Sequence, residues 1–242
     1  MLDAIQNLFF SLIYPEECRV CGLHVESHND GIACRECWAA TRIFDGSEML
    51  CEKCGAFFGD KAAPIPVFCR KCDDHHYDKA TAAGIYEKAL AANIVNLKNT
   101  PTLSHRLKAI ISTAGNRKVL NDADLIVPIP LSARRRIERG FNQADLIAET
   151  VSRSTRIPVD AHSLARKTHT PIHRVGMDQK ARELTVKNAF KVVRPKLIEG
   201  KTILLVDDVL TSGATASSCA KALKKSGAHN VSVFTLARAV LH

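Results

Sequence analysis

Eight of the nine cysteines lie in the first third of the chain, where they form four CxxC pairs. The pairs are Cys18/Cys21, Cys34/Cys37, Cys51/Cys54 and Cys69/Cys72. A CxxC turn places two thiolates on one side of a tight knuckle, and two knuckles complete a tetrahedral four-sulfur shell around zinc. About 60 residues with few large apolar side chains cannot bury a sufficient core of their own. We therefore predict two structural Zn2+ sites in this part of the chain.

Two pairings of the knuckles are open. If the first knuckle pairs with the second and the third with the fourth, only the short segments 22–33 and 55–68 are enclosed, and the entropy cost of loop closure is low. This favours two serial zinc ribbons, with an interleaved arrangement as the alternative. Disulfides are a further alternative, but no signal peptide is recognisable, and in a reducing compartment this spacing favours metal.

The N-terminal segment MLDAIQNLFFSLIYPEEC does not resemble a secretory signal, because it has an acidic third residue, no basic region and no small-residue cleavage site. Its apolar run is too short to span a bilayer. Its apolar spacing predicts an amphipathic helix over residues 2–13, which we expect to dock on the protein itself, docking on a membrane being the alternative. We therefore expect a cytoplasmic protein without a transmembrane segment, and leave peripheral association with the inner membrane open.

The formal charge of +9 and the pI of about 9.2 indicate an anionic partner, such as phosphates, nucleic acid or a membrane surface. Basic residues lie between the knuckles, and the aromatic side chains beside them could stack on single-stranded bases. The alternative is that these aromatic rings are buried within the ribbons. The residues concerned are Arg19, Arg35, Arg42, Lys53, Lys61, Arg70 and Lys71, with Trp38, Phe57 and Phe58.

After Tyr77 the cysteine pairs stop and apolar strands alternate with helical patterns. We place the domain boundary there, so that residues 1–77 form the N-terminal helix and double zinc ribbon and residues 78–242 form a larger domain. Strands are predicted at TAAGIY, DLIVPIP, HSLARK, KTILLVDD and VSVFTLARAV, and helices at 89–97, 104–111, 142–154 and 215–226. The segment 168–180 has weak periodicity and predicts a mobile excursion. This alternation predicts a parallel α/β sheet covered by helices on both faces.

The stretch ILLVDDVLTSGAT, residues 203–215, carries the chemistry of the larger domain. Ligands of open parallel sheets bind beyond the carboxyl ends of the strands. Asp207 and Asp208 follow a buried apolar run there, and the residues after them supply hydroxyls and main-chain amides that lead into a helix N-terminus, a suitable cradle for an anion. A phosphate beside two carboxylates indicates a phosphorylated ribose as ligand.

Two other nucleotide-related folds are excluded by spacing. A Walker A loop ends in Gly-Lys-Ser/Thr, and no lysine occurs between Lys201 and Lys221. A receiver domain also begins with an apolar strand and an acidic pair. However, too few residues follow Asp208 for its further strand and helix units.

These residues also carry a resemblance. ILLVDDVLTSGAT resembles the phosphoribosyl diphosphate (PRPP) motif of type I phosphoribosyltransferases. Together with VPIPL, RRRIERGFNQADLIA, NAFKV and the four CxxC knuckles, it makes the chain similar to the ComF family of competence-related proteins over essentially its whole length. The resemblance implies a type I phosphoribosyltransferase-like parallel sheet with helices on both faces, preceded by a small double zinc-ribbon module in which four cysteines hold each metal.

The resemblance also assigns roles to residues. It implies that Asp207 and Asp208 hold the ribose hydroxyls, and that the 5-phosphate is held by Thr211, Ser212, Gly213, Ala214 and Thr215. The loop after VPIP would bind pyrophosphate and Mg2+ through Arg134, Arg135, Arg136 and Arg139. A solvated basic face or a nucleic-acid patch is the alternative for these arginines. Lys98 falls where the family tends to have a basic residue, without an assigned role.

The leading functional hypothesis is a competence-type protein for DNA uptake and transformation. It would bind PRPP or a related phosphorylated ribose in the larger domain and single-stranded DNA through the zinc ribbons and basic loops, with proteins of the DNA-uptake machinery as further partners. The alternatives are an active phosphoribosyltransferase in nucleotide salvage and a PRPP-sensing regulator. No catalytic residue is assigned, and Cys219 is interpreted as a small buried residue.

Overall fold

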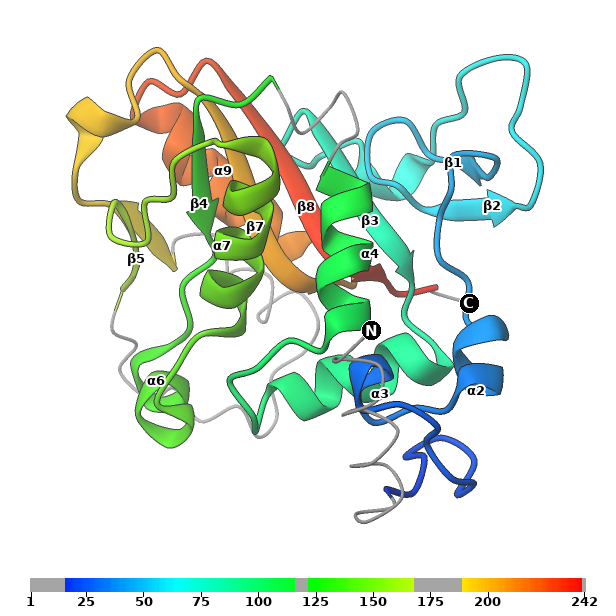
Figure 1. Ribbon diagram of the computed structural model, residues 1–242. Helices are drawn as coiled ribbons and strands as arrows, with labels where there is room; N and C mark the ends of the chain where they lie inside the picture. Colours follow the sequence, from blue (N-terminus) through cyan, green and yellow to red (C-terminus); the bar gives the residue numbers. More distant parts are fainter. Residues whose placement is uncertain (1–15, 116–121, 168–188, 241–242) are drawn as a thin grey trace, which may run out of the picture.

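A four-stranded parallel sheet lies at the centre of the computed structural model, which describes residues 16–115, 122–167 and 189–240 (Figure 1). The strand order is β3, β8, β7, β4, and every neighbouring pair is parallel. The predicted parallel sheet is therefore confirmed. The strands are β3 (Lys79–Ile85), β8 (Asn230–Arg238), β7 (Thr202–Leu210) and β4 (Leu125–Pro128).

Helices cover both faces of this sheet, as the alternation of strands and helices predicts (Figure 1). Along β7, Leu204 and Val206 join the buried cluster on one face, while Ile203 and Leu205 join the cluster on the other. Successive side chains of a strand point to opposite faces, so an uninterrupted apolar strand requires two covers. One cover consists of α3 (Lys88–Leu97), α4 (His105–Gly115) and α7 (Gln143–Thr155); the other contains α9 (Ala214–Lys225), with β5 (Leu164–Arg166) and β6 (Phe190–Val192) as a small antiparallel sheet.

The helix boundaries follow local signals. Asn142 caps α7, because its Oδ1 accepts a hydrogen bond from the amide of Ala144 at 3.3 Å. Pro101 falls between α3 and α4, as expected. Two further expectations, the helix over residues 2–13 and the excursion at 168–180, lie outside the described residues. Cys219 is fully buried on α9, and burial raises the pKa of its thiol well above the ordinary value, which fits the expectation of a small core residue.

The two cysteine-rich segments straddle the β3 edge of the sheet (Figure 1). Ile43, in the chain between them, forms an antiparallel bridge with Gly84, and the amide of Ala80 donates to the carbonyl of Lys53 at 2.7 Å. A Cβ at Gly84 would lie 2.5 Å from the carbonyl oxygen of Arg42, so this approach requires glycine. The first segment holds η1 (His28–Asp30) and α2 (Arg35–Ala39); the second holds β1 (Met49–Leu50), β2 (Phe57–Gly59) and η2 (Arg70–Cys72).

Each cysteine-rich segment contributes to a different part of the core. Cys18, Cys34 and Cys37 join the cluster formed with α3, α4 and α7. Cys51, Cys54 and Cys72 join the cluster beneath α9. The N-terminal segments therefore share their buried surface with the sheet domain and also protect its edge strand.

Candidate functional site

Two adjacent carboxylates lie near the carboxyl end of β7. The amide of Asp208 donates to Oδ1 of Asp207 (2.9 Å), and the amide of Val209 donates to Oδ1 of Asp208 (2.7 Å). The sequence predicts a strand that ends at Asp208, but β7 continues to Leu210 because β8 stays paired with it as far as Arg238. Both partly buried carboxylates are therefore held by a paired strand, at the sheet edge where ligands bind in such folds.

Lys98 adds a positive charge to this acidic pair. It follows the C-terminus of α3, and its Nζ lies 4.0 Å from Oδ2 of Asp208. Burial, and after it the neighbouring Asp208 carboxylate, raises the pKa of Asp207 to about 7, against the opposing effects of the Asp208 amide and Lys98. A bound cation or hydroxyl donor would favour the ionised form of Asp207. The two carboxylates and Lys98 together make a site that can accept hydrogen bonds and still tolerate an anion nearby.

The segment 211–215, which we call the phosphate loop, runs from the end of β7 into the first turn of α9. Gly213 is the N-cap of α9 with φ +81°, and it supplies no side-chain acceptor for the first amides of the helix. The first turn contains no acidic residue, and the hydroxyl of Ser212 accepts from the amide of Ala214 only at 3.4 Å. Thr211 and Ser212 are exposed and Thr215 is exposed as well. An uncapped helix N-terminus beside three exposed hydroxyls is suited to a phosphate.

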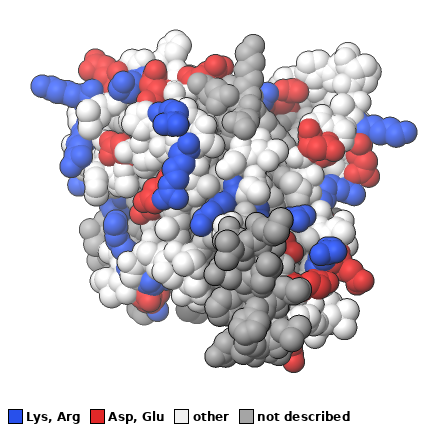
Figure 2. All heavy atoms as spheres, in the orientation of Figure 1, with Lys and Arg blue, Asp and Glu red and all other residues white. Residues whose placement is uncertain are grey.

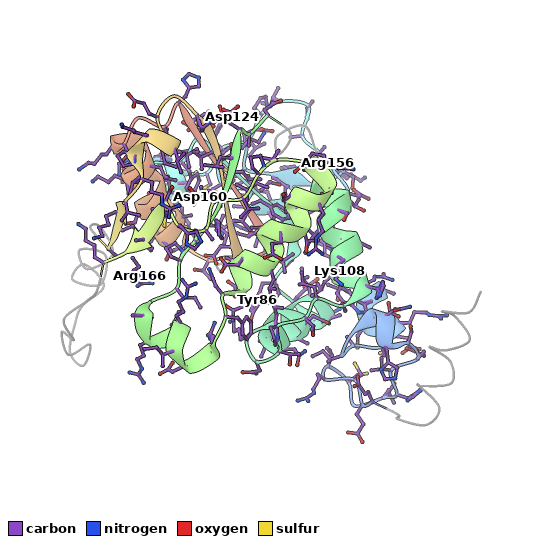
Figure 3. All side chains as sticks on the ribbon, turned by 60° about the vertical axis from the view of Figure 1, so that its left-hand side comes forward. Tyr86, Lys108, Asp124, Arg156, Asp160 and Arg166 are labelled. Atoms are coloured by element: carbon purple, nitrogen blue, oxygen red, sulfur yellow. The ribbon has the colours of Figure 1, made fainter. Side chains whose placement is uncertain are left out.

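Figure 3 labels residues at the two opposite edges of the sheet. Tyr86, directly after β3, lies at the carboxyl edge of the sheet, below which α6 extends, whereas Asp124 lies at the opposite, amino edge, before β4. Asp124 accepts a hydrogen bond from the amide of Thr202 (2.8 Å), at the start of β7. Asp124 is therefore a carboxylate at the far edge of the sheet that bonds the start of β7, and it can serve as a matched control for the acidic pair.

The four arginines after VPIP lie on a helix, α6 (Ala133–Arg139), and not on the loop that the resemblance implies. Ser132 caps this helix, since its hydroxyl accepts from the amide of Arg135 (3.4 Å), and Gly140 ends it in the left-handed conformation. Arg134 pairs with Glu138 at 2.6 Å. Arg134, Arg135 and Arg136 are exposed, and Arg139 is partly exposed. Within the described residues, no ion pair joins these arginines to the carboxylates of β7.

The eight paired cysteines form two separate groups of four. Cys18, Cys21, Cys34 and Cys37 form the first cluster, and Cys51, Cys54, Cys69 and Cys72 form the second; in each, all ligand atoms lie within 4.8 Å of one another. The serial pairing is therefore the observed one. Sulfur atoms are 3.6 Å apart between Cys21 and Cys34 and 3.4 Å apart between Cys54 and Cys69.

These sulfur separations fit zinc. A tetrahedral shell with Zn–S bonds of about 2.3 Å places its sulfurs about 3.8 Å apart, whereas a disulfide needs about 2 Å. Main-chain amides also favour the thiolate form of one cysteine in each cluster. Burial opposes ionisation of Cys18, but amides led by that of Cys34 lower its pKa to about 6. Burial likewise opposes ionisation of Cys51, and amides led by that of Cys54 lower its pKa to about 7. Both clusters are consistent with structural zinc sites.

Most of the aromatic residues near the knuckles contact other residues of the ribbons. Trp38 is buried and donates from Nε1 to the carbonyl of Asp30 (2.8 Å). Phe57 stacks on Phe44, with the guanidinium of Arg42 over its ring. Phe58, in contrast, is 46% exposed. On the face shown in Figure 2, basic side chains are interspersed with acidic ones and do not gather into one patch.

Family profiles match two parts of the chain. Residues 9–74 match the double zinc ribbon domain, and residues 116–240 match the phosphoribosyl transferase domain. Competence protein F of Haemophilus influenzae is 33% identical over 180 residues, which cover 71% of this chain and 78% of that protein. The chain belongs to the ComF family.

A further relative agrees with the ComF assignment. The DNA utilization protein YhgH of Escherichia coli (strain K12) is 29% identical over 235 residues, which cover 94% of this chain and 99% of that protein. Among solved structures, the glutamine phosphoribosylpyrophosphate amidotransferase from B. subtilis, complexed with ADP and GMP, is 17% identical, with a TM-score of 0.37 over 74% of this chain and 33% of that chain. In the described part of this ComF-family chain, no helix is long and apolar enough to cross a membrane.

The sequence did not predict the contacts that two residues make at the site. Lys98 precedes Asp208 by more than a hundred positions, and only the fold brings them together. Arg238, at the end of β8, donates from Nη1 to the carbonyl of Leu210 (2.7 Å) and to that of Thr211, directly before the phosphate loop and at its first residue. An arginine that ends an apolar strand is unusual enough to have been a signal, since arginine is seldom fully buried without a partner.

Proposed function

We propose that this ComF-family chain is a competence-type protein acting in DNA uptake or utilisation, and that it binds PRPP or a related phosphorylated ribose at the carboxyl edge of β7. One observation carries the proposal: an acidic pair and an uncapped helix N-terminus adjoin on one strand end, with Lys98 beside them. A ligand that carries hydroxyls next to a phosphate matches this order of groups. The relatives named for competence and DNA utilisation supply the biological context.

Each group has a chemical task in this proposal. The carboxylates of Asp207 and Asp208 accept hydrogen bonds from the ribose hydroxyls, and the amides and hydroxyls of the phosphate loop donate to the 5-phosphate. Lys98 offsets the diphosphate charge, and the arginines of α6 lie on the same side of the sheet (Figures 1 and 3). Mg2+ bound with PRPP would neutralise diphosphate oxygens.

Equilibrium titration with PRPP and Mg2+ tests the ligand. Asp208→Asn should weaken binding by about tenfold or more, because a hydrogen bond to a charged acceptor is replaced by a weaker one. Asp124→Asn is the matched control, because this carboxylate lies at the opposite edge of the sheet. Equal affinities of Asp208→Asn and the wild type would refute the placement of the ligand.

The DNA part of the proposal rests on the basic charge of the chain and on exposed groups of the second ribbon, Phe58 among them. Single-stranded DNA binds to such surfaces through stacking on aromatic rings and through phosphate contacts that weaken with salt. Filter binding of a single-stranded oligonucleotide at two salt concentrations tests this. Absence of binding at low salt, or binding without a salt dependence, would contradict it.

A second candidate function is a phosphoribosyltransferase in nucleotide salvage. It is favoured by the match of residues 116–240 to the phosphoribosyl transferase domain. In that reaction, the bond between the ribose carbon and pyrophosphate breaks as a bond to a base forms. Measuring pyrophosphate release with PRPP, Mg2+ and a panel of bases separates a transferase from a protein that only binds PRPP.

A further inference from the structure

The second cysteine cluster, Cys51/Cys54/Cys69/Cys72, contacts the back of the phosphate loop through one buried cation. Arg238 is only 6% exposed. Its Nη1 donates to the carbonyls of Leu210 and Thr211, and its Nη2 donates to Sγ of Cys54 at 3.9 Å. A single side chain thus joins a metal-ligating sulfur to the start of the loop.

Electrostatics explain why Arg238 can remain buried. Among the described residues it has no acidic side chain as an ion-pair partner, and its Nε has no hydrogen-bond partner. A buried cation without a counter-charge is costly. Four thiolates outweigh the charge of one Zn2+, so a zinc-loaded cluster carries a net negative charge beside the guanidinium. The metal-loaded state of this cluster is therefore the one that suits Arg238.

A second contact runs from the same cluster to the loop. His75 and Tyr77 follow the last knuckle, and Nδ1 of His75 is 2.6 Å from the hydroxyl of Tyr77. A Cβ at Gly213 would lie 2.7 Å from Cε1 of His75 and 2.8 Å from the hydroxyl of Tyr77. The amide of His76 donates to the hydroxyl of Ser217, in α9, at 3.0 Å. The segment after the second cluster therefore lies against both the loop and the helix that it begins.

The first cluster has different neighbours. Its surroundings include Asp30, which accepts from Trp38 and lies 3.6 Å from Arg106 of α4. These contacts lead to the opposite face of the sheet, away from α9. The first cluster therefore serves as an internal control when the effect of metal on the phosphate loop is measured.

We infer that the second cluster positions the phosphate loop through Arg238, Tyr77 and His75, so that metal loading of this cluster sets the affinity of the loop for a sugar phosphate. This inference rests on the proposed function of the loop. Removal of the metal leaves Arg238 without its counter-charge and releases the carbonyls that it holds. By linkage, a ligand that binds the loop must raise the metal affinity of the second cluster by the same factor.

The first test needs no ligand. Amide hydrogen exchange of residues 211–215 is measured in the zinc-loaded wild type, in Cys54→Ser and in Cys21→Ser. We expect faster exchange in the loop for Cys54→Ser and no change for Cys21→Ser. Tyr77→Phe keeps the ring but removes the hydroxyl that lies 2.6 Å from Nδ1 of His75, so it should also accelerate exchange even if a cysteine variant does not fold. Equal loop exchange in the wild type, Cys54→Ser and Tyr77→Phe overturns the inference.

The second test measures the equilibrium partition of zinc between the protein and a zinc-selective chelating dye, with and without PRPP and Mg2+. We expect PRPP to raise the zinc affinity of one of the two sites by about tenfold. Arg238→Gln should abolish this increase, while Arg238→Lys should retain part of it. If PRPP binds but both zinc affinities are unchanged, the coupling is wrong and the proposed function stands. If PRPP does not bind although metal controls loop exchange, the proposed function is wrong and the coupling stands.

Discussion

Asp207 is the residue whose ionisation the fold perturbs most at the candidate site. Burial and the adjacent Asp208 raise its pKa to about 7, against about 3.9 in an unfolded chain. A raised folded-state pKa contributes stability that is complete below the unfolded pKa and is lost as the pH rises through the folded one. The ionised carboxylate is therefore a cost to the unliganded protein above pH 7.

We predict that Asp207→Asn raises the free energy of unfolding at pH 8 by on the order of 1–3 kcal/mol, and by less at pH 5. Urea denaturation at the two pH values measures this. Asp160→Asn is the control, and it should lower the free energy of unfolding at pH 8. Burial opposes ionisation of Asp160, but hydrogen bonds led by that from Ser163 hold its pKa below the ordinary value. An increase in the free energy of unfolding of Asp207→Asn that is the same at both pH values would contradict a raised pKa of Asp207.

Gly213 is constrained both by its backbone and by its neighbours. Its φ is +81°, and His75 and Tyr77 occupy the space that a Cβ would need. Gly140 has a similar φ of +75° but open space around it. We predict that Gly140→Ala costs about 1–2 kcal/mol from the left-handed backbone alone, and that Gly213→Ala costs about 1–3 kcal/mol more. Chemical denaturation of both variants tests this. Equal losses in the free energy of unfolding would show that the contact of Gly213 with His75 and Tyr77 is not tight.

At the scale of elements, α6 stands out because all seven of its residues keep some exposure, including Ile137, which is 84% exposed. Capping residues at both ends hold this helix, and six of its seven side chains are exposed to solvent. We predict that the double variant Arg135→Gln, Arg136→Gln leaves the midpoint of thermal unfolding within about 2 °C of the wild type. It should also reduce the salt dependence of binding to PRPP or single-stranded DNA. Arg153→Gln, on α7, is the control, and an unchanged salt dependence would remove α6 from the binding surface.

Much of the element order could be predicted because it depends on local patterns. Apolar runs predicted the central strands, and Asn142 and Pro101 marked helix limits. The helix α6 was missed, although Ser132 and Gly140 bracket it with ordinary capping residues. The resemblance to the family directed attention to a loop at this position.

The contacts that complete the site depend on the tertiary structure, and no local pattern reports them. Lys98 lies near Asp208, and Arg238 near Cys54, because the folded sheet brings together residues that are far apart in the sequence. The serial pairing of the cysteine knuckles was predicted from short loops, and the two observed clusters confirm it. The roles of the acidic pair, the phosphate loop and the arginines stay predictions that ligand binding must test.

At the scale of the whole molecule, the cysteines of the two clusters belong to the same buried clusters as the sheet. We predict that chelation of zinc destabilises the entire protein in one cooperative transition, and lowers its unfolding midpoint by on the order of 10 °C or more. Calorimetry with and without chelator measures this, with re-addition of Zn2+ as control. A sheet domain that keeps its midpoint while a small separate transition disappears would show that the ribbons fold independently.

The central claim is that the carboxyl edge of β7 holds a phosphorylated ribose. A calorimetric titration with PRPP and Mg2+, in which pyrophosphate is assayed in the same samples, tests this most directly. We predict saturable heat at one site per chain in the wild type, weakened by about tenfold or more in Asp208→Asn and unchanged in Asp124→Asn. Pyrophosphate appearing during the titration would identify an enzyme. An absence of binding heat at temperatures on either side of 25 °C, with no pyrophosphate formed, would contradict the claim.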